Sequence, residues 1–384
     1  MNSEKDVVGL TRRLVGFHSV SNVSSKEIAD FISNMLDSAG FSVEQQSYRL
    51  SDGIEKVNVI AQKGTGMAKL ALSGHIDTVP FDEKEWRNRN PLDLVERDGR
   101  FFGRGACDMK GFLAVAMVAG MRIAAHELSR PFALVFTSDE EVGCIGARKL
   151  IEAKGKIADM FVIGEPTGFQ PFILHKGYMF VRISMRGKGG HSSEPAKGRN
   201  VIERALPMVI ERVNEFREAL QNITDNRLKP VYPTLNIGKL TMSRNAAKNI
   251  IAEECTLDLD MRPIPGQDVD EIFDALRRHV APDGVINGIS VEVKLMRKPT
   301  LPFETHPDAQ IVRETVLMTG QEATSTSFNT EGGIFNHAGS ESVICGLGSI
   351  DQAHQPDEFI DARFFKEDVV RRYEDLIRRM CGNQ

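Results

Sequence analysis

The first 180 residues alternate between short apolar runs and longer segments with helical spacing. Apolar side chains recur at steps of three and four residues over 28–39, which predicts an amphipathic helix that ends at Gly40. The segment 110–126 predicts a second helix. Short apolar runs predict strands at 57–61, 69–73, 131–137 and 160–163. Strands that alternate with helices favour a mostly parallel sheet with helices on both faces.

The pattern changes near residue 178. An alternating strand at 178–187 precedes a long amphipathic helix that begins at Val201, and Pro207 inside it predicts a kink or a break. Further elements follow, with strands at 234–240 and 252–261 and a helix at 270–280. From about residue 290 the first pattern resumes, with a helix at 309–319, a strand at 342–347 and a last helix at 366–381. We therefore expect an α/β fold in which a mostly parallel mixed sheet, flanked by helices, is built from 1–177 and 291–384, with a smaller α+β domain inserted at 178–290.

Composition excludes several classes of protein. The 384 residues, 41% hydrophobic and 26% charged, suit about two domains with an ordinary buried core. A net charge of −5 gives no reason to expect nucleic acid or a membrane as partner. Five scattered cysteines form no CxxC pair, so neither a disulfide framework nor a cysteine zinc site is indicated. The longest apolar run, 111–125, contains Arg122 and is shorter than the ~20 residues that span a bilayer. With no apolar signal-peptide core near its start, the chain is expected in the cytoplasm.

Histidine and acidic residues follow the predicted strands where each strand ends. The sequence GHID (74–77) follows one strand, DEE (139–141) another, Glu165 a third, and His354 lies beyond the last. The carboxyl ends of parallel strands meet at one edge of a sheet, so these side chains are expected to converge. Asp108, in the loop before the helix at 110–126, would join them. Two histidines and several carboxylates are a ligand set suited to zinc, cobalt or manganese.

Each of these residues also has a purely structural interpretation. A histidine two residues before an acid is often part of a turn, and Glu140 and Glu141 could simply begin a helix. Asp108 could cap the helix that follows it, and His354 could be an ordinary loop residue. Their joint placement at strand ends favours a metal centre.

The number of donors fits two ions rather than one. Asp108 would bridge them, with His75 and Glu165 completing one site and Glu141 and His354 the other. Each ion then keeps an open position for water, as catalysis requires. Glu140 is free to accept a proton from that water, and Asp77 could hold the tautomer of the His75 imidazole. The pattern predicts metal-assisted hydrolysis, with an amide as the preferred substrate class.

These motifs resemble the zinc-dependent aminoacylase and carboxypeptidase family, the M20-type metallohydrolases. The resemblance rests on GHIDTVP (74–80), GRGACDMKG (103–111), TSDEEVG (137–143), IGEPT (163–167) and the loop with His354. It implies two divalent ions, zinc with cobalt as a substitute, held by the five ligands named above, with Glu140 as general base. It also implies a cis peptide bond between Asp108 and Met109.

Five further segments resemble the acetylornithine deacetylase branch of that family, namely LHKGY (174–178), GHSSEPAKGRN (190–200), YPTLNIG (232–238), MRPIPG (261–266) and GSIDQAHQPDEF (348–359). The resemblance implies that the substrate is the N-acyl amino acid Nα-acetyl-L-ornithine, cleaved to L-ornithine and acetate in arginine biosynthesis. Alternatives are another acyl-amino-acid deacylase such as a succinyl-diaminopimelate desuccinylase, a metallo-dipeptidase or carboxypeptidase, or a non-catalytic binding protein. The chain contains neither GxxxxGK[ST] nor GxSxG, the motifs of nucleotide-binding and serine-hydrolase alternatives.

The resemblance also assigns residues to the substrate. It implies that the inserted domain is a lid that forms a homodimer, and that its His191 stabilises the oxyanion. Arg262 would bind the substrate carboxylate, and one of Asn245 and Asn249, preferably Asn249, would contact substrate. The loop residues Thr330, Glu331 and Gly332 would hold the amino acid, with Glu331 facing the cationic amine. Without the resemblance, we would interpret His191 as a loop histidine, Arg262 as a solvated arginine and Glu331 as a solvated loop acid.

Overall fold

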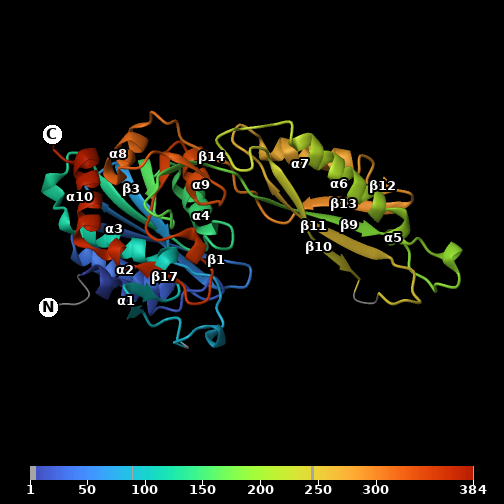
Figure 1. Cartoon of the computed structure of the whole chain (residues 1–384), viewed down its shortest axis with the longest axis horizontal. Coiled ribbons are helices and arrows are strands. Elements are labelled where there is room, and N and C mark those ends of the chain that lie inside the picture. The colour runs from blue at the N-terminus through green and yellow to red at the C-terminus, as the bar shows by residue number, and fades with distance from the viewer. Residues whose placement is uncertain (1–5, 89, 244–245, 384) are drawn as a thin grey trace. The chain divides into compact units, whose positions relative to one another are not determined.

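The computed structural model describes residues 6–88, 90–243 and 246–383, and the chain forms two compact units (Figure 1). Unit 1 comprises Met1–Ile173, Glu304–Thr324 and Thr330–Gln384. Unit 2 comprises Leu174–Phe303 and Ser325–Asn329. Unit 2 therefore begins before the expected boundary at 178 and continues past the expected boundary at 290.

Unit 1 contains the helices α1 (Val7–Val15), α2 (Lys26–Ser38), α3 (Gly111–Arg122), α4 (Ile145–Lys154), α8 (Gln310–Thr319), α9 (Gly332–His337) and α10 (Glu367–Cys381). Its main strands are β1 (Ser42–Arg49), β2 (Glu55–Lys63), β3 (Ala68–His75), β6 (Phe132–Thr137), β7 (Ala158–Ile163) and β16 (Glu341–Ile344). A small separate sheet has the strands β4 (Val95–Arg97), β5 (Arg100–Phe102) and β17 (Phe359–Asp361). Short strands lie where the chain passes between units, namely β8 (Phe172–His175), β14 (Phe303–Glu304) and β15 (Thr324–Thr326).

The main sheet is parallel at its centre and antiparallel toward its edges. Its order is β1–β2–β6–β3–β7–β16–β8–β14, with β15 beside β8. Strand β3 pairs in parallel with both β6 and β7, and β7 pairs in parallel with β16. Strands β1 and β2 are antiparallel, as are β2 and β6. The four central strands therefore end at the same edge of the sheet, and this edge collects the residues that follow them.

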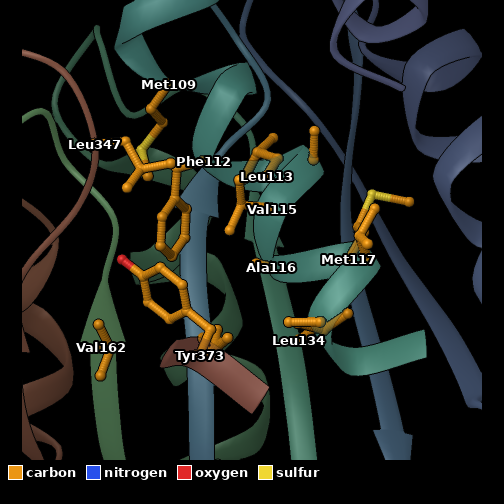
Figure 2. Close-up of a cluster of buried hydrophobic side chains, with 14 of the residues drawn as sticks. Met109, Phe112, Leu113, Val115, Ala116, Met117, Leu134, Val162, Leu347 and Tyr373 are labelled. Atoms are coloured by element: carbon orange, nitrogen blue, oxygen red, sulfur yellow. The ribbon is translucent and has the colours of Figure 1, made fainter. Parts of the chain in front are cut away.

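Helices cover both faces of this sheet, as the alternation along β7 demonstrates. The ring of Phe161 stacks on Phe335 of α9, with centroids 4.2 Å apart. The next residue, Val162, lies in the hydrophobic cluster that contains Tyr373 of α10 (Figure 2). Since successive side chains of a strand point to opposite faces, α9 and α10 lie on opposite sides of the sheet.

Helix α3 is buried on every side because its sequence GFLAVAMVAG carries no charge until Arg122. Its Phe112 meets Tyr373 edge to face, with ring centroids 5.6 Å apart (Figure 2). Such a helix is buried in the core of unit 1, so the turn that precedes it is held against the sheet. That turn, 106–110, carries Asp108.

Unit 2 is an antiparallel sheet with helices on one face (Figure 1). Its strands are β9 (Met179–Arg186), β10 (Thr234–Met242), β11 (Glu254–Arg262), β12 (Val285–Ile286) and β13 (Ile289–Leu295), in the order β10–β11–β9–β13–β12. Its helices are α5 (Val201–Arg204), α6 (Leu206–Leu220) and α7 (Val269–Val280). Apolar residues alternate along β9 and β11, and they bury one face of the sheet beneath the helices.

Two features of unit 2 concern points where the sequence pattern was open or placed a strand elsewhere. The predicted long helix breaks at Ala205, one residue before the helical turn that contains Pro207, because a proline is tolerated in the first turn of a helix. Strand β13 belongs to this unit rather than to the resumed pattern of unit 1, since it pairs antiparallel with β9, with Val293 opposite Ile183.

Across the residues that the structure describes, no helix combines the length and apolarity needed to cross a membrane. All five cysteines are buried and free, so the thiols contribute to packing rather than to crosslinks.

Candidate active site

Residues from four separate segments meet at the carboxyl edge of the central strands. His75 is the last residue of β3 and lies opposite Thr137, the last residue of β6. The ligand atoms of His75, Asp108 and Glu141 lie within 4.8 Å of one another, as do those of His75, Glu140 and Glu165. Parallel pairing of β3 with β6 and β7 produces this convergence, as the strand endings predicted.

The imidazole of His75 is buried and held at both nitrogens. Its Nδ1 lies 2.9 Å from the main-chain oxygen of Asp77, and its Nε2 lies 3.1 Å from Oδ1 of Asp108. The carboxylate of Asp77 is 3.7 Å from Nδ1, beyond hydrogen-bond distance. Of the two groups that Asp77 offers, its carbonyl therefore lies within hydrogen-bond distance of the His75 Nδ1 and its carboxylate does not.

The Asp77 carboxylate instead holds the turn that carries the two glutamates. Its oxygens accept hydrogen bonds from the backbone N–H of Glu140 at 3.1 Å and of Glu141 at 3.3 Å. The hydroxyl of Ser21 donates to it as well, at 2.8 Å. One buried acid thus fixes the main chain at both residues that the sequence singled out as base and ligand.

Asp108 lies between the two histidines. Its Oδ2 is 3.5 Å from Nε2 of His354, and that same nitrogen lies 3.0 Å from Oε2 of Glu141. Asp108 is thereby in contact with both expected half-sites, as a shared ligand must be. The peptide bond between Asp108 and Met109 is cis.

A buried ion pair that the sequence interpretation did not include supports the same turn. Asp139, which precedes Glu140, has a positive φ of 58° and forms an ion pair with Lys56 at 2.9 Å. The hydroxyl of Tyr48 donates to the second oxygen of Asp139 at 3.0 Å. The available signal was a lysine in the apolar strand β2, because a charge at such a position needs a partner.

The charges of the cluster fit divalent cations. Burial raises the pKa of the Glu140 carboxyl to about 8, and burial likewise raises the pKa of Glu141 and of Glu165, with neighbouring carboxylates adding to the effect. Hydrogen bonds to Asp108 and Glu141 raise the pKa of His354 to about 10. Buried acids in this number repel one another, so added positive charge would stabilise them. Imidazole and carboxylate donors at this spacing are ligands that zinc accepts.

The loop that the resemblance assigns to the amino acid lies at the start of α9. The carboxylate of Glu331 is buried, and its Oε1 accepts a hydrogen bond from the Thr137 hydroxyl at 2.5 Å. Its Oε2 has no hydrogen-bond partner among the described residues. Thr330 is buried too, and its hydroxyl accepts from the Gly332 N–H at 3.0 Å. Glu331 is therefore an enclosed acid next to the end of β6, not a solvated loop residue.

The remaining expected site residues belong to unit 2. His191 is exposed, and its Nδ1 lies 2.7 Å from the Ser193 hydroxyl. Arg262 forms a bidentate ion pair with Asp260, at 2.9 and 3.1 Å, and its guanidinium lies 4.1 Å from the centre of the Tyr178 ring. The Asn249 carbonyl accepts from the backbone N–H of Ser192. Asn245, the other asparagine considered, lies outside the described residues.

Known proteins resemble this chain over almost its whole length. Residues 71–379 match the peptidase family M20/M25/M40. An acetylornithine deacetylase of Myxococcus xanthus is 35% identical, with 97% of this chain and 96% of that protein covered. An acetylornithine deacetylase of Proteus mirabilis (strain HI4320) is 34% identical at the same coverage.

Solved structures share the fold at lower sequence identity. An M20 family metallo-carboxypeptidase, Sso-CP2 from Sulfolobus solfataricus, superposes with a TM-score of 0.75 at 20% identity, covering 97% of this chain and 98% of that chain. The YXEP protein of Bacillus subtilis, described as a dinuclear metal-binding peptidase from the M20 family, has a TM-score of 0.65 at 16% identity, with 97% and 96% covered. At these identities the likeness concerns the α/β architecture alone.

Proposed function

This chain belongs to peptidase family M20/M25/M40 and is a hydrolase that acts on amides, and from that premise we propose that it removes the acetyl group of Nα-acetyl-L-ornithine. The products are L-ornithine and acetate, and the reaction serves arginine biosynthesis in the cytoplasm. The convergence of His75, Asp108 and Glu141 at one sheet edge carries the proposal. The near-full-length similarity to two acetylornithine deacetylases supports the choice of substrate.

In this proposal the centre would hold two divalent ions, zinc or in its place cobalt. Asp108 would be shared between them, His75 and Glu165 would hold one ion, and Glu141 and His354 would hold the other. Support comes from the contacts of Asp108 with both imidazoles, at 3.1 and 3.5 Å. When bound, such ions polarise an amide carbonyl and lower the pKa of a water molecule.

Glu140 is the general base in this scheme. Its carboxylate accepts the proton of the attacking water and later donates that proton to the leaving nitrogen. This role is supported by the position of Glu140 beside His75 and Glu165 and by the hydrogen bond from its backbone N–H to Asp77. Asp77 positions this base and, through its carbonyl, the His75 ring.

Recognition of the amino acid falls to residues of both units in the proposal. Arg262 binds the α-carboxylate, Asn249 contacts the substrate, and the His191 imidazole donates to the developing oxyanion. Thr330, Glu331 and Gly332 hold the amino-acid part, with the buried Glu331 carboxylate set against the side-chain amine. The inserted part, 178–290 in the sequence interpretation, acts as a lid on the catalytic parts 1–177 and 291–384, and it pairs with a second copy in a homodimer.

The test is acetate release from Nα-acetyl-L-ornithine by protein that is first stripped with a chelator and then reloaded with zinc or cobalt. We expect no turnover after stripping and a kcat/KM of about 10⁴ M⁻¹s⁻¹ or more after reloading. Nα-acetyl-L-norvaline, which lacks the side-chain amine, should react at least tenfold more slowly if Glu331 recognises that amine. Preference for N-succinyl-diaminopimelate or for a dipeptide would contradict the substrate and leave the amide hydrolase standing.

A further inference from the structure

A fully buried glutamate outside the expected site accepts four hydrogen bonds. Oε2 of Glu358 accepts from Nη1 of Arg104 at 2.8 Å and from the backbone N–H of Gly105 at 3.0 Å. Its Oε1 accepts from the backbone N–H of Cys107 at 2.8 Å and of Asp108 at 3.0 Å. A carboxylate has about four acceptor positions in two oxygens, so each oxygen of Glu358 serves two donors.

These donors all belong to the segment 104–108, which leads into the turn at 106–110 and includes Asp108. The N–H of Lys110 donates to the Gly105 carbonyl at 2.7 Å across this turn, and inside it Asp108 and Met109 have non-helical φ and ψ angles. The Glu358 carboxylate also holds this backbone in place, because it accepts hydrogen bonds from the N–H groups of Gly105, Cys107 and Asp108. The Arg104 guanidinium compensates the buried negative charge and lies 5.2 Å from the ring centre of Trp86.

The same glutamate belongs to the loop that carries His354. Its own carbonyl accepts from the Gly103 N–H at 3.0 Å, and the next residue, Phe359, pairs with Phe102 in the small sheet of β17 and β5. Glu358 therefore links two segments that lie about 250 residues apart in sequence, through both its main chain and its side chain. One segment ends in Asp108 and the other begins with His354.

We propose that Glu358 is a positioning residue which sets the spacing between Asp108 and His354, and so sets the affinity of the centre for divalent cations. The inference rests on the proposed function, because it takes both residues as metal ligands. Glutamine at this position has one acceptor oxygen, and its amide NH₂ would face N–H donors of the turn or of Arg104. At least two donors would lose their partner, and the segment that positions Asp108 would be held by fewer hydrogen bonds.

The experiment measures Co²⁺ binding to the stripped full-length protein, by competition with a chromophoric chelator and by the visible absorption of the bound Co²⁺. In E358Q we expect both ions to bind about 10–100-fold more weakly, with a changed Co²⁺ spectrum, because Asp108 is shared. The matched control is D357N, one residue away, where the side chain of Asp357 pairs with the exposed Arg87. It should bind Co²⁺ as the wild type does.

A purely structural role would lower the melting temperature of E358Q and leave the affinity and spectrum of the folded protein unchanged, and that result overturns the proposal. If E358Q does not fold, R104K removes the guanidinium donor while keeping the charge, and it should bind Co²⁺ at least threefold more weakly. Wild-type affinity in folded R104K overturns the proposal in that case. A wild type that binds two Co²⁺ without hydrolysing acetylornithine contradicts the proposed substrate alone, whereas a wild type that binds none contradicts both.

Discussion

The ammonium group of Lys56 lies 2.9 Å from Oδ1 of Asp139, and both side chains are buried. Lys56 also donates to the carbonyls of Ser21 and Val23, at 2.8 and 2.7 Å. Asp139 directly precedes Glu140, and the hydroxyl of Ser21 binds Asp77. Lys56 thus connects strand β2 directly to Asp139 and, through Ser21, to Asp77. These two acids hold the turn that carries Glu140.

Replacing Lys56 by methionine is expected to lower the free energy of unfolding by about 3–5 kcal/mol. The substitution leaves the Asp139 carboxylate buried without its cation, which costs more than the ion pair contributes when intact. Urea titration followed by circular dichroism measures the change. K149M, at an exposed ion pair on α4, should leave the unfolding midpoint unchanged within error. An equally small effect of K56M would show that water reaches Asp139.

Replacing Glu140 by glutamine is expected to retain both metal ions while kcat falls about 10²–10⁴-fold. The amide keeps the size of the side chain but cannot accept a proton, so only the acid–base step is lost. Elemental analysis and steady-state kinetics on the same preparation distinguish the two effects. E152Q, on the exposed part of α4, is the control. Loss of an ion from E140Q would make Glu140 a ligand instead, an outcome consistent with its closeness to His75 and Glu165.

Replacing His354 by alanine should reduce the metal content from two ions per chain to one. The imidazole contacts Glu141 and Asp108 but not His75, so the half-site of His75 and Glu165 keeps its own donors. Elemental analysis after equilibration with zinc measures the ratio. H126A removes a histidine from the surface and should still bind two ions. Two ions in H354A would contradict the assignment of His354.

Replacing His191 by alanine is expected to reduce kcat about 10²–10³-fold with little change in KM. A donor that binds the oxyanion acts in the transition state and not on the bound substrate. The kinetic split is the measurement, with metal content determined alongside. H279A, an exposed histidine of the same unit paired with Glu215, should behave as the wild type. A rise in KM at unchanged kcat would contradict the oxyanion role.

Replacing Gly164 by alanine should destabilise unit 1 by about 1–3 kcal/mol, because a Cβ there would lie 2.0 Å from Cδ1 of Phe112. Gly164 stands between the end of β7 and Glu165, so the strain should also weaken metal binding. Denaturant unfolding and Co²⁺ titration measure both effects. G238A in unit 2 is the control, since its Cβ would make only ordinary contacts of 3.7 Å and longer. Unchanged stability of G164A would require the Phe112 ring to move at no cost.

The elements that the sequence predicts correctly are those whose periodicity reflects burial. Strands β3, β6 and β7 and helix α2 appear where short apolar runs and helical spacing place them, and comparison with known proteins confirms the family that the strand-end motifs resemble. The convergence of His75 with Glu141 and Glu165 was predictable because these residues follow parallel strands, and Asp108 joins them from the turn before α3. Parallel strands bring their ends together whatever lies between them.

Other features depend on contacts between distant segments and leave no local pattern. Strand β13 alternates like any half-buried strand, and only its pairing with β9 assigns it to unit 2. A pattern such as HxD likewise could not reveal that Asp77 holds His75 through its carbonyl and the glutamate turn through its carboxylate.

The sequence by itself determined which side chains stand at the strand ends, and with them the chemistry available to the site. The tertiary structure decided how those side chains are held, through Lys56 on Asp139 and Glu358 on the Asp108 turn. A buried charge must find its counter-charge or hydrogen-bond donors within about 3 Å, and in both cases the partner is a segment about 80 to 250 residues away. Such partners are selected by the packing of the folded chain, because local sequence constrains only the neighbours within a turn or a strand.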